Sequence, residues 1–518
     1  MSLHKSIIKS ASLISTAIFC SRILGFIRDI IIAAFFGTGM VVEAFFVAFR
    51  IPNMLRDLIG EGAANAAFVP VFCEYQAKNK REDFWRLIED MFWLLLIFLS
   101  ILTLLGIIFS KPLVSIIAPG FLKEPQKLSL TVQLTRVLFP YLILIGLTAY
   151  GMGILHTFKS FTAPAFGASL LNLAMIGSVI FAYSKFTQPI YALALGVLVG
   201  GILQVAIQVP FLKSKGMQLV LRKPVFSQPG IKKIVRLLIP RIFGAAVYQL
   251  NVFVDTILAS LSFIVGSGAV AAIYYANRII QFPLALFGIA LSSAVLPTIS
   301  RYAAEKDLEG IKSSLGFSLR SLYFMMLPAS LGILILAQPL IKVFFQRGQF
   351  DLYSTQITSN ALTFYALGLV FFGWVKLMIA GFHSLQDTKT PVKCAFLSLL
   401  LNIVLDIILI FPLRVGGLAL ASSIAGAFNF FLLHSFLKKR IGTIFNKKLS
   451  WDFLKIGFAA LAMGFCLKFF FSSVSSYINY GLALFLAIVL AIVSYFIFCW
   501  LLKIEEAVKL IKWLKERR

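Results

Sequence analysis

Residues 11–36 read ASLISTAIFCSRILGFIRDIIIAAFF, an apolar stretch long enough to cross a bilayer that nevertheless contains Arg22, Arg28 and Asp29. A charged side chain at the centre of a bilayer costs at least ~2.5–3.5 kcal/mol, so such residues usually face a protein interior or a water-filled cavity. We therefore predict that this stretch is a membrane helix forming one wall of a polar chamber. It is too long for the apolar part of a signal peptide and lacks an A-x-A cleavage site, so we expect it to be retained.

The composition predicts an all-α polytopic membrane protein with about 14 transmembrane helices. The chain has 518 residues, of which 60% are hydrophobic and 13% charged, whereas a soluble domain is nearer ~45–50% apolar and ~25% charged. Apolar stretches of about 20 residues, the length that crosses a ~30 Å hydrocarbon core, recur along the whole chain. The expected spans are 11–36, 42–75, 86–110, 131–156, 161–184, 189–212, 234–264, 268–300, 314–345, 356–382, 391–411, 415–437, 453–472 and 480–502.

The net charge of +27 is explained by membrane topology rather than by nucleic-acid binding. Basic residues crowd alternate loops, whereas the intervening turns 263–268 and 472–480 carry no charge. This alternation follows the positive-inside rule, and an even number of spans places both termini in the cytoplasm. The basic loops carry Lys78, Lys80 and Arg81; Lys213, Lys215, Arg222, Lys223, Lys232 and Lys233; and Lys438, Lys439, Arg440, Lys447 and Lys448.

The chain repeats itself at a nearly constant interval. AFFVAFRIPNMLRDLIGEGAANAAFVP, ending at Pro70, parallels AAIYYANRIIQFPLALFGIALSSAVLP, ending at Pro297. GILHTFKSFTAP, ending at Pro164, parallels HSLQDTKTP, ending at Pro391. A third pair begins at residues 192 and 417, so the offsets are 227, 227 and 225. Two six-helix repeats of the same orientation predict a pseudo-two-fold axis along the membrane normal.

This repeat sets the expected domains. Residues 1–225 form an N-lobe of helices 1–6, and residues 226–445 form a C-lobe of helices 7–12. Residues 446–503 add helices 13 and 14, which are expected to form a groove for a lipid tail or, alternatively, a lipid-facing support. Residues 504–518 have apolar residues on one helical face and lysines opposite, as in a cytoplasmic helix lying in the headgroup layer.

Arginines in the apolar segments indicate an anionic substrate. Two facing repeats would bring Arg22, Arg28, Arg56 and Arg278 towards one central space. A guanidinium group binds phosphate bidentately, which a lysine ammonium cannot do, so a diphosphate is a suitable ligand. The alternative is that an arginine near a helix end, such as Arg56, snorkels to the membrane surface or forms a structural ion pair.

A second set of polar residues offers hard oxygen ligands. Asp255 lies within an apolar segment, and Asn402 and Asp406 are one helical turn apart. Together with the Ser422 hydroxyl and a carbonyl near Leu418, they suit a small cation such as sodium. The alternative is structural pairing of Asp255 with a basic side chain, for which Arg241 and Lys376 are the candidates.

Four motifs resemble those of the lipid II flippases (MurJ/MviN) of the multidrug/oligosaccharidyl-lipid/polysaccharide exporter superfamily. They are SRILGFIRD (21–29), EAFFVAFRIPN (43–53) with the following EGA, YYANRIIQFPLALFG (274–288) and QDTKTP (386–391). The resemblance covers essentially the whole chain. It implies alternating-access transport of undecaprenyl-diphosphate-linked peptidoglycan precursor (lipid II) from the inner to the outer leaflet of the bacterial cytoplasmic membrane. Expected partners are lipid II, membrane lipids and other cell-wall synthesis proteins, without nucleic acid.

The resemblance also assigns roles to residues. It implies substrate binding by Arg22, Arg28, Asp29, Arg56, Glu61 and Arg278, and a sodium site, known in some members, at Asp255, Asn402, Asp406, Leu418 and Ser422. No cofactor is expected apart from sodium as a coupling ion. The chain departs from the family pattern at Glu43, where aspartate is common, at Asp57, where a basic residue is common, and at Gln281, where some members have glutamate.

Two other functions are compatible with a polytopic membrane protein. A cation-coupled multidrug exporter of the same superfamily would have twelve helices and an acidic or aromatic chamber, which the arginines and two additional helices argue against. A membrane-embedded glycosyltransferase or acyltransferase would need a catalytic group of residues at the membrane surface, and the sequence shows none. No G-x-x-x-x-G-K-[ST] motif is found, so we predict a transporter, not an enzyme, that is driven by ion gradients.

Overall fold

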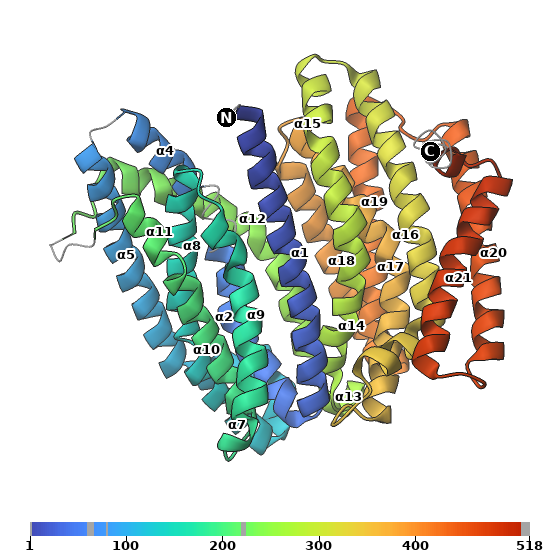
Figure 1. Cartoon of the computed structure of the whole chain (residues 1–518), viewed down its shortest axis with the longest axis horizontal. Coiled ribbons are helices and arrows are strands. Elements are labelled where there is room, and N and C mark those ends of the chain that lie inside the picture. The colour runs from blue at the N-terminus through green and yellow to red at the C-terminus, as the bar shows by residue number, and fades with distance from the viewer. Residues whose placement is uncertain (1–2, 60–66, 79–80, 219–223, 509–518) are drawn as a thin grey trace. The chain divides into compact units, whose positions relative to one another are not determined.

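The structure is a computed structural model of the chain (Figure 1). It describes the backbone of residues 3–59, 67–78, 81–218 and 224–508, and the side chains in these ranges except those of residues 3–15, 55–59 and 240–248. Every regular element in these ranges is a helix, which confirms the predicted all-α fold. Packing divides the chain into two compact units, residues 1–261 and 262–518, and each unit is described by itself.

The first unit is built around α2, α8, α9 and α10. Helix α9 packs against α1 and α10, and α2 packs against α7, α8 and α12. Its elements are α1 (Leu3–Phe36), α2 (Met40–Ile59), α4 (Val69–Lys78), α5 (Arg81–Ile108), α6 (Ser110–Ile117), η2 (Pro119–Lys123), α7 (Pro125–Leu138), α8 (Tyr141–Thr157), α9 (Thr162–Ala182), η3 (Tyr183–Lys185), α10 (Ile190–Ala206), α11 (Val209–Ser214) and α12 (Pro229–Ala259).

The second unit is centred on α17, which packs against α14, α16 and α19, while α20 packs against α16 and α21. Asp307, Asp351, Asn446 and Asn479 cap the first turns of α16, α17, α20 and α21 by accepting backbone N–H bonds. The elements are α13 (Ser262–Val265), α14 (Ala269–Pro283), η4 (Leu284–Ile289), α15 (Ala290–Ala304), α16 (Leu308–Phe345), α17 (Leu352–Ser384), α18 (Lys389–Leu413), α19 (Val415–Ile441), α20 (Lys447–Val474) and α21 (Tyr480–Leu501).

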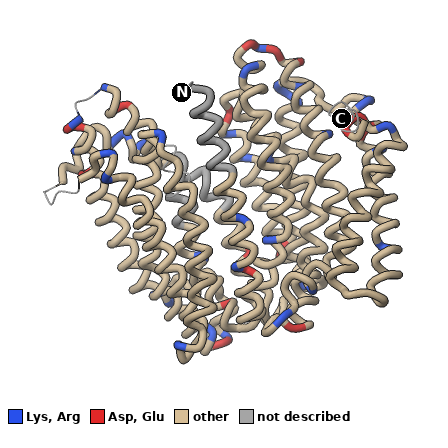
Figure 2. The backbone as a smooth tube through the Cα atoms, viewed as in Figure 1, with Lys and Arg blue, Asp and Glu red and all other residues tan. Residues whose placement is uncertain are grey.

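The helices correspond to the fourteen predicted spans. Within the described residues, 11 helices, some of them continued across a break, are long and apolar enough to cross a membrane. Helices α1, α2 and α12 occupy the three remaining predicted spans, 11–36, 42–75 and 234–264. Lysine and arginine residues lie mainly near the helix ends (Figure 2). The chain is therefore a multi-pass membrane protein.

Two of the predicted spans change geometry at a proline. The span predicted over 131–156 is divided into α7 and α8 at Phe139–Pro140, because a proline lacks the N–H that a continuous helix needs. The span predicted over 268–300 changes to a π-helical turn, η4, directly after Pro283. The short helix α6, between α5 and α7, was not predicted.

The starts of corresponding helices repeat at the same offset as the sequence motifs. An offset of 227 separates the start of α16 from that of α5, the start of α17 from that of α7, and the start of α18 from that of α9. A local departure from helical geometry repeats as well: Phe109 has φ −91° and ψ 19°, and Leu336 has φ −101° and ψ 17°. The two halves therefore share detailed backbone geometry as well as hydropathy.

The turn before the fifth helix of each half is also the same. Lys159 has φ 56° and Gln386 has φ 57°, both in the left-handed region that non-glycine residues seldom adopt. The next N–H in each turn, of Ser160 or Asp387, donates to the carbonyl five residues earlier, at 2.9 and 3.0 Å. These turns belong to the GILHTFKSFTAP and HSLQDTKTP motifs, so the sequence similarity reflects a shared turn.

The predicted domain boundaries follow the internal sequence repeat, whereas the two compact units follow the packing of the helices. Helix α12 begins the predicted C-lobe but packs within the first unit, so the boundary at residues 225 and 226 stays a prediction.

Of the predicted tail 504–518, the structure describes residues 504–508. Ile504 and Ala507 are buried, and Glu506 pairs with Arg320 of α16 at 2.6 Å. This part of the tail therefore lies against the second unit.

Candidate functional site

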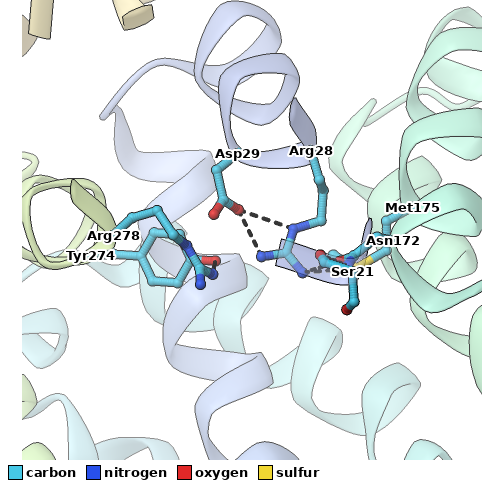
Figure 3. A network of polar contacts seen from close by, with 7 residues as sticks. All are labelled: Ser21, Arg28, Asp29, Asn172, Met175, Tyr274 and Arg278. Atoms are coloured by element: carbon cyan, nitrogen blue, oxygen red, sulfur yellow. Dashed lines mark hydrogen bonds and ion pairs between the residues drawn. The ribbon is translucent and has the colours of Figure 1, made fainter. Parts of the chain in front are cut away.

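The ion pair between Arg28 and Asp29 lies inside the first unit, on membrane helix α1 (Figure 3). Arg28 donates from Nε and Nη2 to one carboxylate oxygen of Asp29, at 3.0 and 2.7 Å. The Asp29 side chain is fully buried, and 11% of the Arg28 side chain is exposed. Asp29 is therefore the ion-pair partner of Arg28. The pair keeps a permanent cation in a helix where an isolated charge would be costly.

A residue that the sequence analysis missed, Asn172 of α9, holds the other side of the guanidinium group. Arg28 Nη1 donates to Asn172 Oδ1 at 2.9 Å, and Asn172 Nδ2 donates to the Ser21 carbonyl at 3.0 Å. Met175 Sδ, one turn further along α9, lies 3.9 Å from Arg28 Nη1. A polar side chain in the apolar run LLNLAM was the available signal. Its long-range partner could not be read from the sequence.

In the second unit, Arg278 of α14 is held by an aromatic side chain on its own helix. Its Nη2 donates to the Tyr274 hydroxyl at 3.1 Å, and its guanidinium carbon lies 5.5 Å from the centre of the Tyr274 ring. Tyr274 precedes Arg278 by one helical turn, so the pair can form within an isolated helix. Aromatic faces stabilise cations by electrostatic attraction. Tyr274 therefore orients Arg278 without neutralising its charge.

The remaining predicted substrate-binding residues are only partly described. Arg22 is exposed on α1, two turns before Asp29. Arg56 lies on α2, but its side chain is outside the described residues, and Glu61 lies outside them entirely. Arg278 belongs to the other unit. A common cavity for the four arginines therefore stays a prediction.

The predicted cation ligands are also divided between the units. Asn402 and Asp406 are fully buried on α18, and Asn402 Nδ2 donates to Asp406 Oδ2 at 2.8 Å. Helix α19, which packs against α18, supplies Leu418 and Ser422. Asp255 is half-buried on α12 in the first unit. The Arg241 side chain, a candidate partner of Asp255, is outside the described residues.

The chemistry of this set fits a hard monovalent cation better than a transition metal. The Ser422 hydroxyl oxygen is buried without a hydrogen-bond partner in the described part of the chain. Carboxylate, amide, hydroxyl and carbonyl oxygens are ligands for hard ions. Among the described residues, no three His, Cys, Asp or Glu side chains are grouped as a metal site would require. The residues of α18 and α19 thus offer ligands of the kind that a hard cation such as sodium prefers, and the sodium site stays a prediction.

Comparisons with known proteins decide the family. The sequence model described as "Lipid II flippase MurJ" matches residues 32–491. The chain is 35% identical to the probable lipid II flippase MurJ of Haemophilus influenzae, over 86% of this chain and 89% of that protein. It is 36% identical to the lipid II flippase MurJ of Burkholderia cenocepacia, over 81% of each. The chain belongs to the lipid II flippase MurJ family.

Solved structures agree with this assignment. A lipid II flippase MurJ in an inward closed conformation matches with a TM-score of 0.78 and 28% identity, covering 94% of this chain and 97% of that chain. A multidrug resistance transporter of the MATE family matches with a TM-score of 0.69 and 16% identity, covering 82% of this chain and 95% of that chain. The second likeness shows the fold alone. The chain is thus a transporter of the lipid II flippase family, not an enzyme.

The first departure from the pattern of this flippase family, Glu43, has a structural partner. Lys127 of α7 donates to Glu43 of α2 at 2.6 Å, and both side chains are almost completely buried. Lys127 also lies 4.1 Å from the centre of the Phe121 ring. The sequence analysis missed Lys127 as a partner. Breaking such a buried pair by removing one member costs about 3–5 kcal/mol, so it fixes α2 to α7.

The other two departures fall outside the described contacts of the flippase. The Asp57 side chain is outside the described residues, and Gln281 is exposed near the end of α14.

The QDTKTP motif of this flippase builds a turn rather than a binding site. Asp387 accepts hydrogen bonds from the Lys389 and Thr390 N–H groups and from the Thr390 hydroxyl, at 2.9, 3.0 and 2.5 Å. It also pairs with Arg440 at 2.6 Å. Burial acts to raise the pKa of Asp387, but the hydrogen bonds from Thr390 and the charge of Arg440 outweigh it, so the pKa is lowered below 3.8. The carboxylate ties the α17–α18 turn to the end of α19.

Proposed function

We propose that this protein moves lipid II from the inner to the outer leaflet of the bacterial cytoplasmic membrane by alternating access. Family membership supplies the substrate class. The observation that carries the mechanism is Arg28, a permanent cation in a membrane helix that is held by Asp29 and Asn172. A fixed guanidinium at this depth suits a diphosphate, which it can bind through two parallel hydrogen bonds.

The headgroup of lipid II would cross in a cavity between the two lobes. Its sugars and charges cannot enter hydrocarbon unaided, because burying unpaired polar groups is costly. Arg22, Arg28, Arg56 and Arg278 would bind the diphosphate, with Asp29 and Glu61 orienting the cations. The undecaprenyl tail would stay in the lipid, next to α20 and α21. Rocking of the lobes would then expose the cavity to each side in turn.

A sodium ion would reset the cycle. The ligands would be Asp255, Asn402, Asp406, Leu418 through its carbonyl, and Ser422. A cation that moves down an inside-negative potential gains about 2.3 kcal/mol per charge per 100 mV. This energy can return an outward-open transporter to its inward-open state. The chain's own carboxylates would hold the charge at this site during the transition.

The orientation of the protein is part of the proposal. Basic loops on one side support cytoplasmic termini, which places the first-half loop around residue 216 inside and the turn 472–480 outside. Other cell-wall synthesis proteins would supply lipid II on the inner face and use it on the outer face, which makes them the natural partners.

Depletion of the protein in its own cells tests this function. Lipid II should accumulate in the inner leaflet while its synthesis continues, and expression of the wild-type chain should restore outer-leaflet lipid II. Arg28→Ala should insert into the membrane but fail to restore it. Normal outer-leaflet lipid II after depletion would contradict the proposed function. Full restoration by Arg28→Ala would contradict the role of the arginine alone.

A further inference from the structure

We infer that Asn172 is a positioning residue for the diphosphate-binding arginine, acting through Arg28 rather than on the lipid itself. This inference rests on the proposed function, because it gives Arg28 the role of binding the diphosphate. The geometry points to Asn172 for three reasons: its two fixed hydrogen bonds, its neutrality and its place on α9 (Figure 3).

Both ends of the Asn172 amide are engaged, so its orientation is fixed. The oxygen accepts from Arg28 Nη1 at 2.9 Å, and the nitrogen donates to the Ser21 carbonyl at 3.0 Å. Ser21 and Arg28 are seven residues apart on α1 and therefore lie on the same face. Gly25 lies between them, and a Cβ added there would be 3.5 Å from the Asn172 amide nitrogen. The amide thus spans two turns of α1.

The contacts hold the guanidinium group from two sides. Asp29 accepts from Nε and Nη2, whereas Asn172 accepts from Nη1. Asp29 accepts both of its hydrogen bonds through one oxygen, so by itself it would let the guanidinium group pivot about that oxygen. Bidentate recognition of phosphate depends on the plane and direction of the fork. Two acceptors on different nitrogens set that direction before the ligand arrives, which lowers the entropic cost of binding.

A neutral amide is the side chain that this position requires. Asp29 already balances the single charge of Arg28, so the pair has no net charge. A carboxylate in place of Asn172 would give the group a net charge of −1 and repel a diphosphate. An apolar side chain would leave Nη1 without this acceptor and the Ser21 carbonyl without this donor. The Asn172 side chain, 6% exposed, provides an acceptor without adding charge.

The second half of the chain offers the informative substitution. At the repeat offset of 227, the counterpart of Asn172 is Leu399, so Asn172→Leu places the second-half residue in the first half and removes both hydrogen bonds of the amide. Gln204→Leu is the matched control. Gln204 is a buried amide on α10, next to α9. No contact in the described residues links it to Arg28.

The experiment measures binding of undecaprenyl diphosphate to the purified full-length protein in detergent, with undecaprenol as the probe that lacks the diphosphate. Asn172→Leu should raise the dissociation constant for the diphosphate about tenfold, leave undecaprenol binding unchanged, and unfold at the same temperature as Gln204→Leu. In an Arg28→Lys background, adding Asn172→Leu should change the constant by less than about twofold, because lysine has no fork to position.

Three results would overturn the inference. The first is wild-type affinity in Asn172→Leu while Arg28→Ala loses binding, which would leave the proposed function intact. The second is an equal loss in the wild-type and Arg28→Lys backgrounds, which would mean that Asn172 acts independently of Arg28. If Asn172→Leu does not insert, Asn172→Asp decides, since it keeps an acceptor for Arg28. Asn172→Asp should bind undecaprenyl diphosphate more weakly than wild type. Binding equal to that of wild type is the third result that would overturn the inference. Wild-type affinity in Arg28→Ala would instead count against the proposed function.

Discussion

The two halves of the chain carry opposite charges at equivalent places. Arg28 lies on the first helix of the first half, and its counterpart at the offset of 227 is Asp255, on the first helix of the second half. Met175, which contacts Arg28, corresponds by the same offset to Asn402. The helices α9 and α18, which carry this second pair, begin at matching positions. One backbone design therefore presents a cation in one half and an anion in the other.

The comparison teaches how a repeated scaffold can separate two binding tasks. Repeats of the same orientation place equivalent positions at the same depth in the membrane. In the first half, Arg28 is steadied by Asp29 and Asn172, and the set suits an anionic headgroup. In the second half, Asp255 and Asn402 belong to the set that suits a sodium ion. Equivalent positions of the two repeats thus carry residues that suit ligands of opposite charge.

The largest effect is expected from the substitution that places the second-half residue, the aspartate of position 255, at the equivalent first-half position 28. Arg28→Asp removes one member of a buried ion pair, which lowers the free energy of unfolding by about 3–5 kcal/mol. It also places two adjacent carboxylates at the proposed diphosphate site. We expect complete loss of growth when this variant is the only flippase in the cell, measured by complementation of a depleted strain.

Arg28→Lys provides the control for charge in the same assay. It keeps the positive charge but loses the fork, so growth should be impaired less than in Arg28→Asp. Normal growth of both variants would contradict the proposed difference between the two halves, because position 28 would then not require a cation.

The second test concerns the anionic half. A sodium ion bound by the native state stabilises it by mass action. The unfolding temperature in detergent should therefore be higher in sodium than in potassium at equal ionic strength. Asp406→Asn should abolish most of this difference, because it removes a charge from the fully buried pair with Asn402.

Asp351→Asn makes the same chemical change at the first turn of α17, where asparagine can still cap the helix. It should keep the full sodium effect. Equal melting of the wild type in both salts would leave Asp406 and Asn402 as structural partners, and only the cationic half would then have a binding role.

The sequence predicted the helices and the repeat better than it predicted the partners of polar residues. The length of each apolar stretch and the constant offset between the repeats are local or periodic signals, and they located the 11 helices of the described residues that are long and apolar enough to cross a membrane. The contacts of Asn172 with Arg28 and of Lys127 with Glu43 join residues 144 and 84 positions apart. Many apolar helix faces look alike in sequence, so nothing local indicates that α9 packs against α1 or α7 against α2. Pro140 was visible in the sequence, and the break between α7 and α8 was not predicted there.

The smallest expected effect concerns the one turn in which the halves share a backbone but differ in chemistry. Asp387 in the second half corresponds to Ser160 in the first. Asp387→Asn can still accept backbone N–H bonds but loses the charge that pairs with Arg440, whose side chain is 46% exposed. We expect a loss of about 1 kcal/mol or less. Ser160→Ala, the matched change in the first half, should lie within about 0.5 kcal/mol of wild type.

The pH dependence of thermal unfolding separates the contribution of the Asp387 charge from that of its hydrogen-bond geometry. Because the pKa of Asp387 is lowered in the folded protein, its carboxylate contributes stability above its unfolded value of 3.8. That contribution is lost as the pH falls through the lower, folded pKa. Thermal unfolding of wild type and Asp387→Asn should therefore differ fully at neutral pH and converge as the pH falls below 3.8, whereas Ser160→Ala should follow wild type throughout. A constant difference across this range would mean that the turn in the second half depends on hydrogen-bond geometry alone, as the turn in the first half does.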